Sequence, residues 1–209
     1  MKRLWFAILL LALSMFATAQ TQLTESQSRE VVSSLTEAAT SMQTLQCRFV
    51  QQKTMSMLAE PTISEGTLHY AAPDKMRWEY AKPYPFALIV NGAQTIRIKD
   101  GKAETLDANQ AKMYKGLADL IMGSTSGKKL FDTTAFDIVL FDDGNVWKAE
   151  MTPKRRDMKR MFSQLVFCFD KTLQTATQVE FIESDGNKTI IQFSEIELDA
   201  VIDDGTFKE

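Results

Sequence analysis

The strongest constraint on the fold is an alternation of apolar and polar residues that recurs in short segments from position 45 almost to the end of the chain. Leu45, Cys47 and Phe49, for example, are separated by the polar residues Gln46 and Arg48. A period of two is typical of a strand with one buried face. Turn sequences such as Asn91-Gly92, which favour hairpins, separate the segments. We therefore predict strands over residues 45–57, 63–70, 75–80, 86–90, 95–99, 102–106, 136–141, 146–152, 161–169, 175–183 and 188–195.

Two segments depart from this period and predict helices. Residues 24–45 carry apolar side chains at every third or fourth position, and Thr24 with Gln27 suits a capping box. A second helical spacing begins near Asn109 and ends at Gly123, a residue that suits a C-cap. Eleven strands in one continuous antiparallel run suggest a highly curved sheet, and its concave face is the large apolar surface on which the helices can pack. The predicted fold class is mainly β with helices (α+β).

The N-terminus predicts an exported protein. Lys2 and Arg3 precede an apolar run of about 13 residues, and Ala17-Thr18-Ala19 is a suitable cleavage site. The run is shorter than the roughly 20 residues that span a bilayer, so we favour a cleaved signal peptide over an anchor. No Cys lies near position 20, so a lipid-attachment box is absent there. We predict a signal peptide over residues 1–19 and a single domain over residues 20–209.

Composition argues against catalysis, metal binding and nucleic-acid binding. The chain has one His and two Cys, whereas a structural zinc site takes about four such ligands. Without Lys2 and Arg3, the 24 basic residues become 22 against 27 acidic ones, a net charge of −5 that disfavours binding to nucleic acid. His69 is out of phase with its apolar neighbours, which favours a structural or surface role. We expect no enzymatic activity, no cofactor and no metal.

Two further features leave alternatives open. In an exported protein, Cys47 and Cys168 could form a disulfide or remain separate buried thiols. A basic cluster lies between two predicted strands and consists of Lys154, Arg155, Arg156, Lys159 and Arg160. We favour a solvated connection for this cluster, and a docking patch for an acidic partner or for anionic lipid head groups is the alternative.

The most informative residues are the aromatic and aliphatic side chains that share one face of the predicted strands. Each could be ordinary core, but together they could line a hydrophobic cavity, because two helices are a small cover for so large a face. The candidate cavity residues are Phe49, Leu68, Tyr70, Met76, Trp78, Tyr80, Leu88, Val90, Phe167, Phe169, Phe181 and Phe193.

Two segments resemble the periplasmic outer-membrane lipoprotein carrier protein family (LolA). Phe49-Val50-Gln51-Gln52-Lys53 is similar to the first strand of that family, F-x-Q-x-K, and residues 66–80 are similar to its next segment, G-x-L followed by Pro and Trp. The similarity extends from about residue 28 to residue 195. It implies an incomplete antiparallel β-barrel of about eleven strands with a helical lid over a hydrophobic cavity. The implied lid residues are Leu35, Met113, Leu117, Leu120 and Ile121.

The resemblance also implies a function without catalysis. A family member is a periplasmic carrier that binds the acyl chains of lipoproteins released from the inner membrane and delivers them to the outer membrane. Its partners would be acylated lipoproteins, an inner-membrane lipoprotein-releasing ABC transporter and, where one exists, an outer-membrane acceptor. We expect the protein to act as a monomer in the periplasm.

One position departs from the family. Its best-known members have an Arg directly before the Pro, where it holds the lid closed, and here that position is Ala72. The alternative hypothesis is therefore a LolA-like module that binds another lipid or a glycolipid, or that senses the state of the envelope through a protein partner.

Overall fold

The computed structural model describes residues 20–108, 111 and 131–209. The predicted signal peptide lies outside the described residues, as do the predicted lid residues Met113, Leu117, Leu120 and Ile121.

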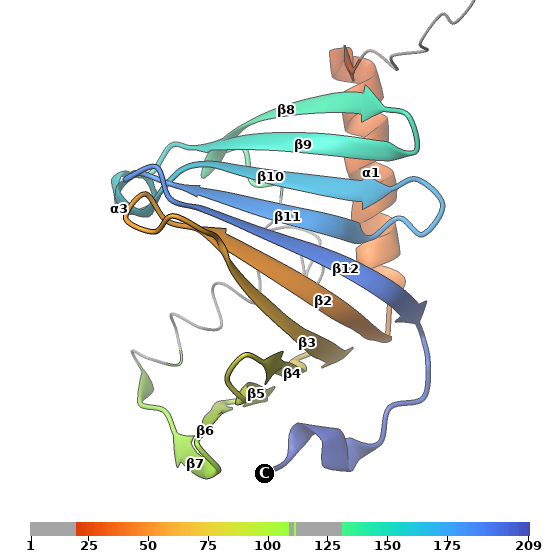
Figure 1. Ribbon diagram of the computed structural model, residues 1–209. Coiled ribbons are helices and arrows are strands. Elements are labelled where there is room, and N and C mark those ends of the chain that lie inside the picture. Colours follow the sequence, from red (N-terminus) through yellow and green to blue (C-terminus); the bar gives the residue numbers. More distant parts are fainter. Residues whose placement is uncertain (1–19, 109–110, 112–130) are drawn as a thin grey trace, which may run out of the picture.

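Within this part of the chain, twelve strands form a single antiparallel sheet (Figure 1), which confirms the mainly β prediction. In chain order they are β1 (Thr21–Gln22), β2 (Thr44–Thr54), β3 (Thr62–Ala71), β4 (Lys75–Lys82), β5 (Phe86–Asn91), β6 (Gln94–Lys99), β7 (Lys102–Thr105), β8 (Phe136–Asp143), β9 (Val146–Pro153), β10 (Phe162–Asp170), β11 (Ala176–Glu183) and β12 (Lys188–Leu198). Eleven of them correspond to the predicted strands. The additional strand, β1, has only two residues, too few to show a period.

The sheet consists of two meanders that meet at β12 and β2. The spatial order is β1-β8-β9-β10-β11-β12-β2-β3-β4-β5-β6-β7. The expectation of one continuous run is wrong in this respect, because β7 and β8 follow each other in the chain but are not neighbours in the sheet. The last strand pairs instead with the first long one, and Phe193 lies opposite Phe49 across this seam.

Helix α1 (Glu25–Ser41) crosses the strands β8 to β12 on one face of the sheet (Figure 1). The predicted capping box is present: the backbone N–H of Gln27 donates to Thr24 Oγ1, and the side chain of Gln27 accepts from the backbone N–H of Thr24. The helix ends four residues before the predicted boundary, and Leu45 belongs to β2. Val31 and Leu35 pack into the apolar cluster of the sheet, and we call the face that carries this cluster the inner face.

Two short helical elements were not predicted. Helix α3 (Arg156–Met161) lies within the basic cluster, and a 3-10 helix, η1 (Asp204–Phe207), lies near the C-terminus. Phe207 of η1 is buried against Ile89 and Ile96 on the outer face of the sheet. Arg77 fastens this segment by donating to the carbonyl oxygens of Thr206, at 3.4 Å, and Lys208, at 3.2 Å. Because the C-terminal segment covers the outer face of β5, this strand is buried on both faces. Its sequence is therefore an uninterrupted apolar run without alternation.

The two cysteines are free thiols. Cys47 lies in β2 and Cys168 in β10, with β11 and β12 between them. Three strand spacings of about 4.8 Å exceed the reach of a disulfide, whose Cα atoms lie within about 7 Å. Of the two alternatives, the structure therefore has the separate thiols.

No helix among the described residues is long and apolar enough to cross a membrane.

Gly66 allows the ring of Phe49 to lie against the backbone of β3. A Cβ at this position would come within 2.0 Å of the Glu79 carbonyl oxygen and 2.6 Å of the Phe49 ring. Replacement of Gly66 by Ala should therefore lower the free energy of unfolding by roughly 1–3 kcal/mol, because the packed ring and backbone must shift. Urea denaturation monitored by circular dichroism measures this, with Ser64→Ala in the same strand as the control. Equal stability of the two variants would contradict the packing described here.

Burial raises the pKa of the Cys47 thiol to about 12. Since the thiolate is the reactive form, the reactive fraction near pH 8 is roughly a thousandfold lower than for a thiol with an ordinary pKa of about 9. In a Cys168→Ser variant, we expect Cys47 to react with Ellman's reagent very slowly in the folded protein and rapidly in guanidinium chloride. Rapid reaction in the folded state would show that β2 is more open than described.

Candidate functional site

One apolar cluster on the inner face contains all twelve candidate cavity residues. Tyr80 and Phe193 are partly buried and pack against it. The other ten are buried within it, and they are Phe49, Leu68, Tyr70, Met76, Trp78, Leu88, Val90, Phe167, Phe169 and Phe181. The period-two pattern therefore assigned these side chains to the correct face. Their part in binding a ligand remains a prediction.

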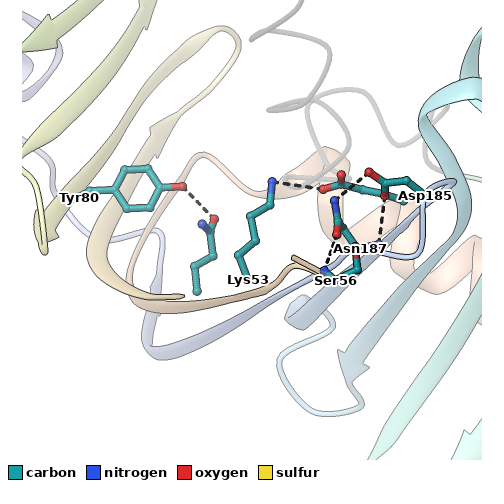
Figure 2. Close-up of polar contacts among 7 residues, drawn as sticks. Lys53, Ser56, Tyr80, Asp185 and Asn187 are labelled. Atoms are coloured by element: carbon teal, nitrogen blue, oxygen red, sulfur yellow. Dashed lines mark hydrogen bonds and ion pairs between the residues drawn. The ribbon is translucent and has the colours of Figure 1, made fainter. Parts of the chain in front are cut away.

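Aromatic rings from β2, β4 and β12 form the part of this cluster nearest the seam. The ring centroid of Phe49 lies 4.3 Å from that of Trp78 and 5.1 Å from that of Tyr80. Phe193 packs edge-on against Trp78 at 6.3 Å. The hydroxyl of Tyr80 donates to Gln51 Oε1 at 2.9 Å (Figure 2), and burial raises the pKa of Tyr80, so the hydroxyl keeps its proton. The aromatic surface is thus largely apolar, and the hydroxyl at its edge is satisfied.

A cavity of about 330 Å³ lies between α1 and the end of the sheet where β10 turns into β11. Its apolar lining includes Leu35 and Met42 of α1 and its C-cap, together with Phe131, Phe169 and Leu173. Polar residues also border it, among them Glu37, Gln174 and Asp199.

Of the predicted cavity and lid residues that the structure describes, only Leu35 and Phe169 line this space. A second cavity, of about 20 Å³, touches Leu68 and Phe193. The other described candidates are buried in the apolar cluster or packed against it. Met42 belonged to the predicted helix over residues 24–45 but was not among the predicted lid residues. Leu173 was missed because it lies in the turn after β10, where neither period applies.

The cavity-facing turn between β10 and β11 is tied to α1. Gln174 has a left-handed backbone conformation, with φ of 53°, and its Nε2 donates to Ser34 Oγ at 2.6 Å. Asp170 Oδ1 holds the turn by accepting from the backbone N–H groups of Thr172 and Leu173. One side of the cavity is therefore bordered by this side-chain hydrogen bond and by the apolar residues of α1.

Neither Arg48 nor Arg77 reaches the inner face to take the place of the family's Arg. Ala72 stands where the resembling family has Arg. Arg77 lies on the outer face, 2.6 Å from Glu79 and bonded to the C-terminal carbonyls, and so points away from Met76 and Trp78. Arg48 is exposed, with Glu195 at 3.8 Å.

The described part of the chain was predicted to bind no metal, and His69 is its single histidine. No group of three or more His, Cys, Asp or Glu among those residues could hold a metal ion. His69 is partly buried in β3 opposite Arg77, and its Nδ1 has no hydrogen-bond partner among the described residues. Burial and the charge of Arg77 lower the pKa of His69, so the ring is neutral at pH 7. A neutral ring with a buried, unpaired nitrogen fits the structural role predicted for it.

Comparison with known proteins identifies relatives over most of the chain. The family described as "Outer membrane lipoprotein carrier protein LolA" matches residues 40–209. An outer-membrane lipoprotein carrier protein of Dechloromonas aromatica (strain RCB) is 29% identical over 167 residues, which cover 79% of this chain and 76% of that protein. A protein of the same description from Methylobacillus flagellatus is 27% identical over 151 residues, or 69% of this chain and 67% of the relative.

A solved structure, that of an uncharacterized conserved protein from Thermus thermophilus, has the same fold. It superposes with a TM-score of 0.55 at 9% identity and covers 88% of this chain and 94% of that one. At this identity the likeness shows the fold alone. The family match, by contrast, spans the seam, the aromatic rings and the outer-face cover at the C-terminus. Members of the matched family are periplasmic, non-enzymatic carriers. This chain belongs to the LolA family of outer membrane lipoprotein carrier proteins.

Proposed function

We propose that this protein carries lipoproteins across the periplasm by binding their acyl chains, after their release from the inner membrane, and delivers them to the outer membrane. The observation that carries the proposal is the apolar inner face covered by α1, with a cavity of about 330 Å³ beneath the helix. Such a face can shield hydrocarbon from water without any reactive group.

The energetics of acyl chains fit such a site. Burial of one methylene is worth roughly 0.8 kcal/mol, so a 16-carbon chain represents on the order of 10 kcal/mol. A chain of this kind does not cross an aqueous compartment unshielded. A carrier must bury it and must also release it, so the net affinity has to be smaller than this transfer free energy.

Displacement of α1 would supply the opposing cost. Pockets for small ligands are about 300–1,000 Å³, so a cavity of about 330 Å³ is small for several acyl chains. In this proposal the helix moves away when acyl chains enter, with loss of the apolar burial of Val31, Leu35 and Met42. At roughly 1.5–3 kcal/mol for each buried side chain, this loss offsets a large part of the gain from one acyl chain. Loading then needs an energy source outside the protein, such as an ATP-driven transporter.

The proposed location and partners follow from the same function. The predicted signal peptide over residues 1–19 would export the chain, which then acts as a monomer in the periplasm. The proposed partners are acylated lipoproteins, an inner-membrane lipoprotein-releasing transporter and an outer-membrane acceptor.

A second candidate function rests on Ala72. Without an Arg at this position, the lid would lack the family's closing contact. Among the described residues, the hydrogen bond between Gln174 and Ser34 holds α1 to the turn after β10. A module with this difference could take another lipid or a glycolipid, or could respond to a protein partner in the envelope.

Replacement of Trp78 by Glu should weaken the binding of a fluorescent fatty-acid analogue by roughly tenfold or more, because an unpaired charge would face the hydrocarbon. Titration monitored by fluorescence measures the affinity. The matched control is Tyr84→Glu, since Tyr84 is 82% exposed and lies outside the cluster. Should Trp78→Glu fail to fold, Phe193→Glu at the partly buried edge makes the same test. Unchanged binding in a folded variant would contradict the proposed site.

Depletion of the protein from its own cells separates the two candidate functions. If it is the carrier, lipoproteins should accumulate in the inner membrane, and native mass spectrometry of freshly isolated protein should detect acylated cargo. Fractionation of the two membranes followed by immunoblotting measures the sorting. Normal sorting together with a different co-purified lipid would support the second candidate and reject the carrier.

A further inference from the structure

Three segments meet at the end of the sheet opposite the cavity. They are the β2–β3 loop, the hairpin between β11 and β12, and α3, which lies beside the β2–β3 loop in Figure 1. The backbone N–H of Ser56 donates to Asn187 Oδ1 at 3.0 Å (Figure 2). The same hairpin reaches α3, because Ser184 donates from Oγ to the carbonyl of Lys159 at 2.7 Å and from its N–H to that of Met161 at 3.1 Å. The loops therefore form one connected surface.

Large apolar side chains stand exposed on this surface. Met57, in the β2–β3 loop, is 94% exposed, and its neighbour Leu58 is 48% exposed. Met161, at the end of α3, is 53% exposed. Three such side chains on connected loops are unusual, because isolated exposed apolar residues are common but grouped ones mark interaction sites.

Cations that have no carboxylate partner among the described residues lie beside these side chains. In the basic cluster, Lys154 pairs with Asp137 at 2.9 Å and Arg155 pairs with Asp157 at 2.6 Å. Arg156, Lys159 and Arg160 are exposed or half-exposed, and no ion pair joins them to another part of the described chain. We name the set Met57, Leu58, Arg156, Lys159, Arg160 and Met161 the basic end surface.

The acidic groups described near this surface are few. Glu60 is exposed in the β2–β3 loop, and Asp185 of the hairpin accepts hydrogen bonds from Asn187. Glu183 is engaged by Lys53 at 3.4 Å (Figure 2). The surface is therefore locally cationic on a chain whose residues 20–209 carry a net negative charge.

We propose that the basic end surface docks the protein onto an anionic lipid bilayer. Lipid phosphates are complementary to Arg156, Lys159 and Arg160, and the apolar side chains beside them suit the boundary between head groups and hydrocarbon. Met57 is almost fully exposed on its loop, which suits insertion between head groups better than seating in a protein pocket. The docking does not depend on acyl cargo, so it stands or falls separately from the proposed carrier function.

The position of this surface fixes how a docked molecule would be oriented. Strand β2 has 11 residues and runs from the cavity end at Leu45 to the basic end near Thr54. At about 3.3 Å per residue, the two ends lie roughly 30 Å apart. A molecule docked by the basic end would hold its cavity away from the bilayer surface, open to a partner that reaches into the aqueous space.

Co-sedimentation with vesicles tests the proposal on the chain from residue 20 to residue 209. We expect binding to vesicles of phosphatidylcholine mixed with phosphatidylglycerol, none to phosphatidylcholine alone, and a loss of binding as NaCl is raised. Each cation near an anionic surface contributes about fivefold to the affinity, so the triple variant Arg156→Gln, Lys159→Gln, Arg160→Gln should bind roughly a hundredfold more weakly. Met57→Ser with Leu58→Ser should weaken binding by about tenfold and leave the salt dependence unchanged.

The matched control removes the same charge elsewhere, with Arg29→Gln, Arg48→Gln and Lys208→Gln, all exposed and away from the basic end of the sheet. It should bind mixed vesicles nearly as well as the unaltered chain. Absence of binding to mixed vesicles at low salt would overturn the proposal, and so would an equal loss in the control and in the triple variant. If the protein does not bind mixed vesicles but the triple variant impairs lipoprotein sorting in cells, the surface binds an acidic protein. The lipid proposal is then wrong.

Discussion

An open sheet with one apolar face must cover that face, and in this protein the long covering element among the described residues is α1. Val31 and Leu35 of the helix enter the same cluster as the aromatic side chains of the strands. These contacts are apolar, and the bond between Gln174 and Ser34 joins the same helix to the turn after β10. Dispersion and hydrophobic contacts are non-directional, so the proposed hydrocarbon ligand would meet no network of buried polar bonds that it has to replace.

The opposite face of the sheet is covered in a different manner. There the C-terminal segment is fixed by directional contacts: Arg77 bonds to two carbonyl groups, Lys75 pairs with Asp204 at 2.8 Å, and Phe207 fills the space over Ile89. The two faces therefore differ in how readily they can be uncovered. A cover held by charge-assisted bonds around a buried ring stays in place, whereas a cover held by apolar contact can exchange for another apolar surface.

The sequence pattern predicted the strands and the inner face well, for a physical reason. Side chains alternate strictly along a strand, so Met76 and Trp78 had to share a face, and Arg77 had to lie on the other. The pattern could not predict which strands pair, because Phe49 and Phe193 show the same alternation whichever neighbour they have. Nor could it tell packed core from open cavity, since that depends on where α1 lies. Phe207 was missed because a single ring in a polar tail has no period.

The pairing of β2 with β12 has a consequence for how the chain is made. Gln46 in β2 donates to Glu197 in β12 across a separation of 151 residues. A polypeptide emerges N-terminus first, so β2 presents an open edge while the rest of the chain is still being synthesised. Loss of the last strand through a premature stop codon would remove the centre of the sheet rather than its margin, and would separate two meanders that no other pair of described strands joins. The complete sheet can therefore form only after the final strand has been made.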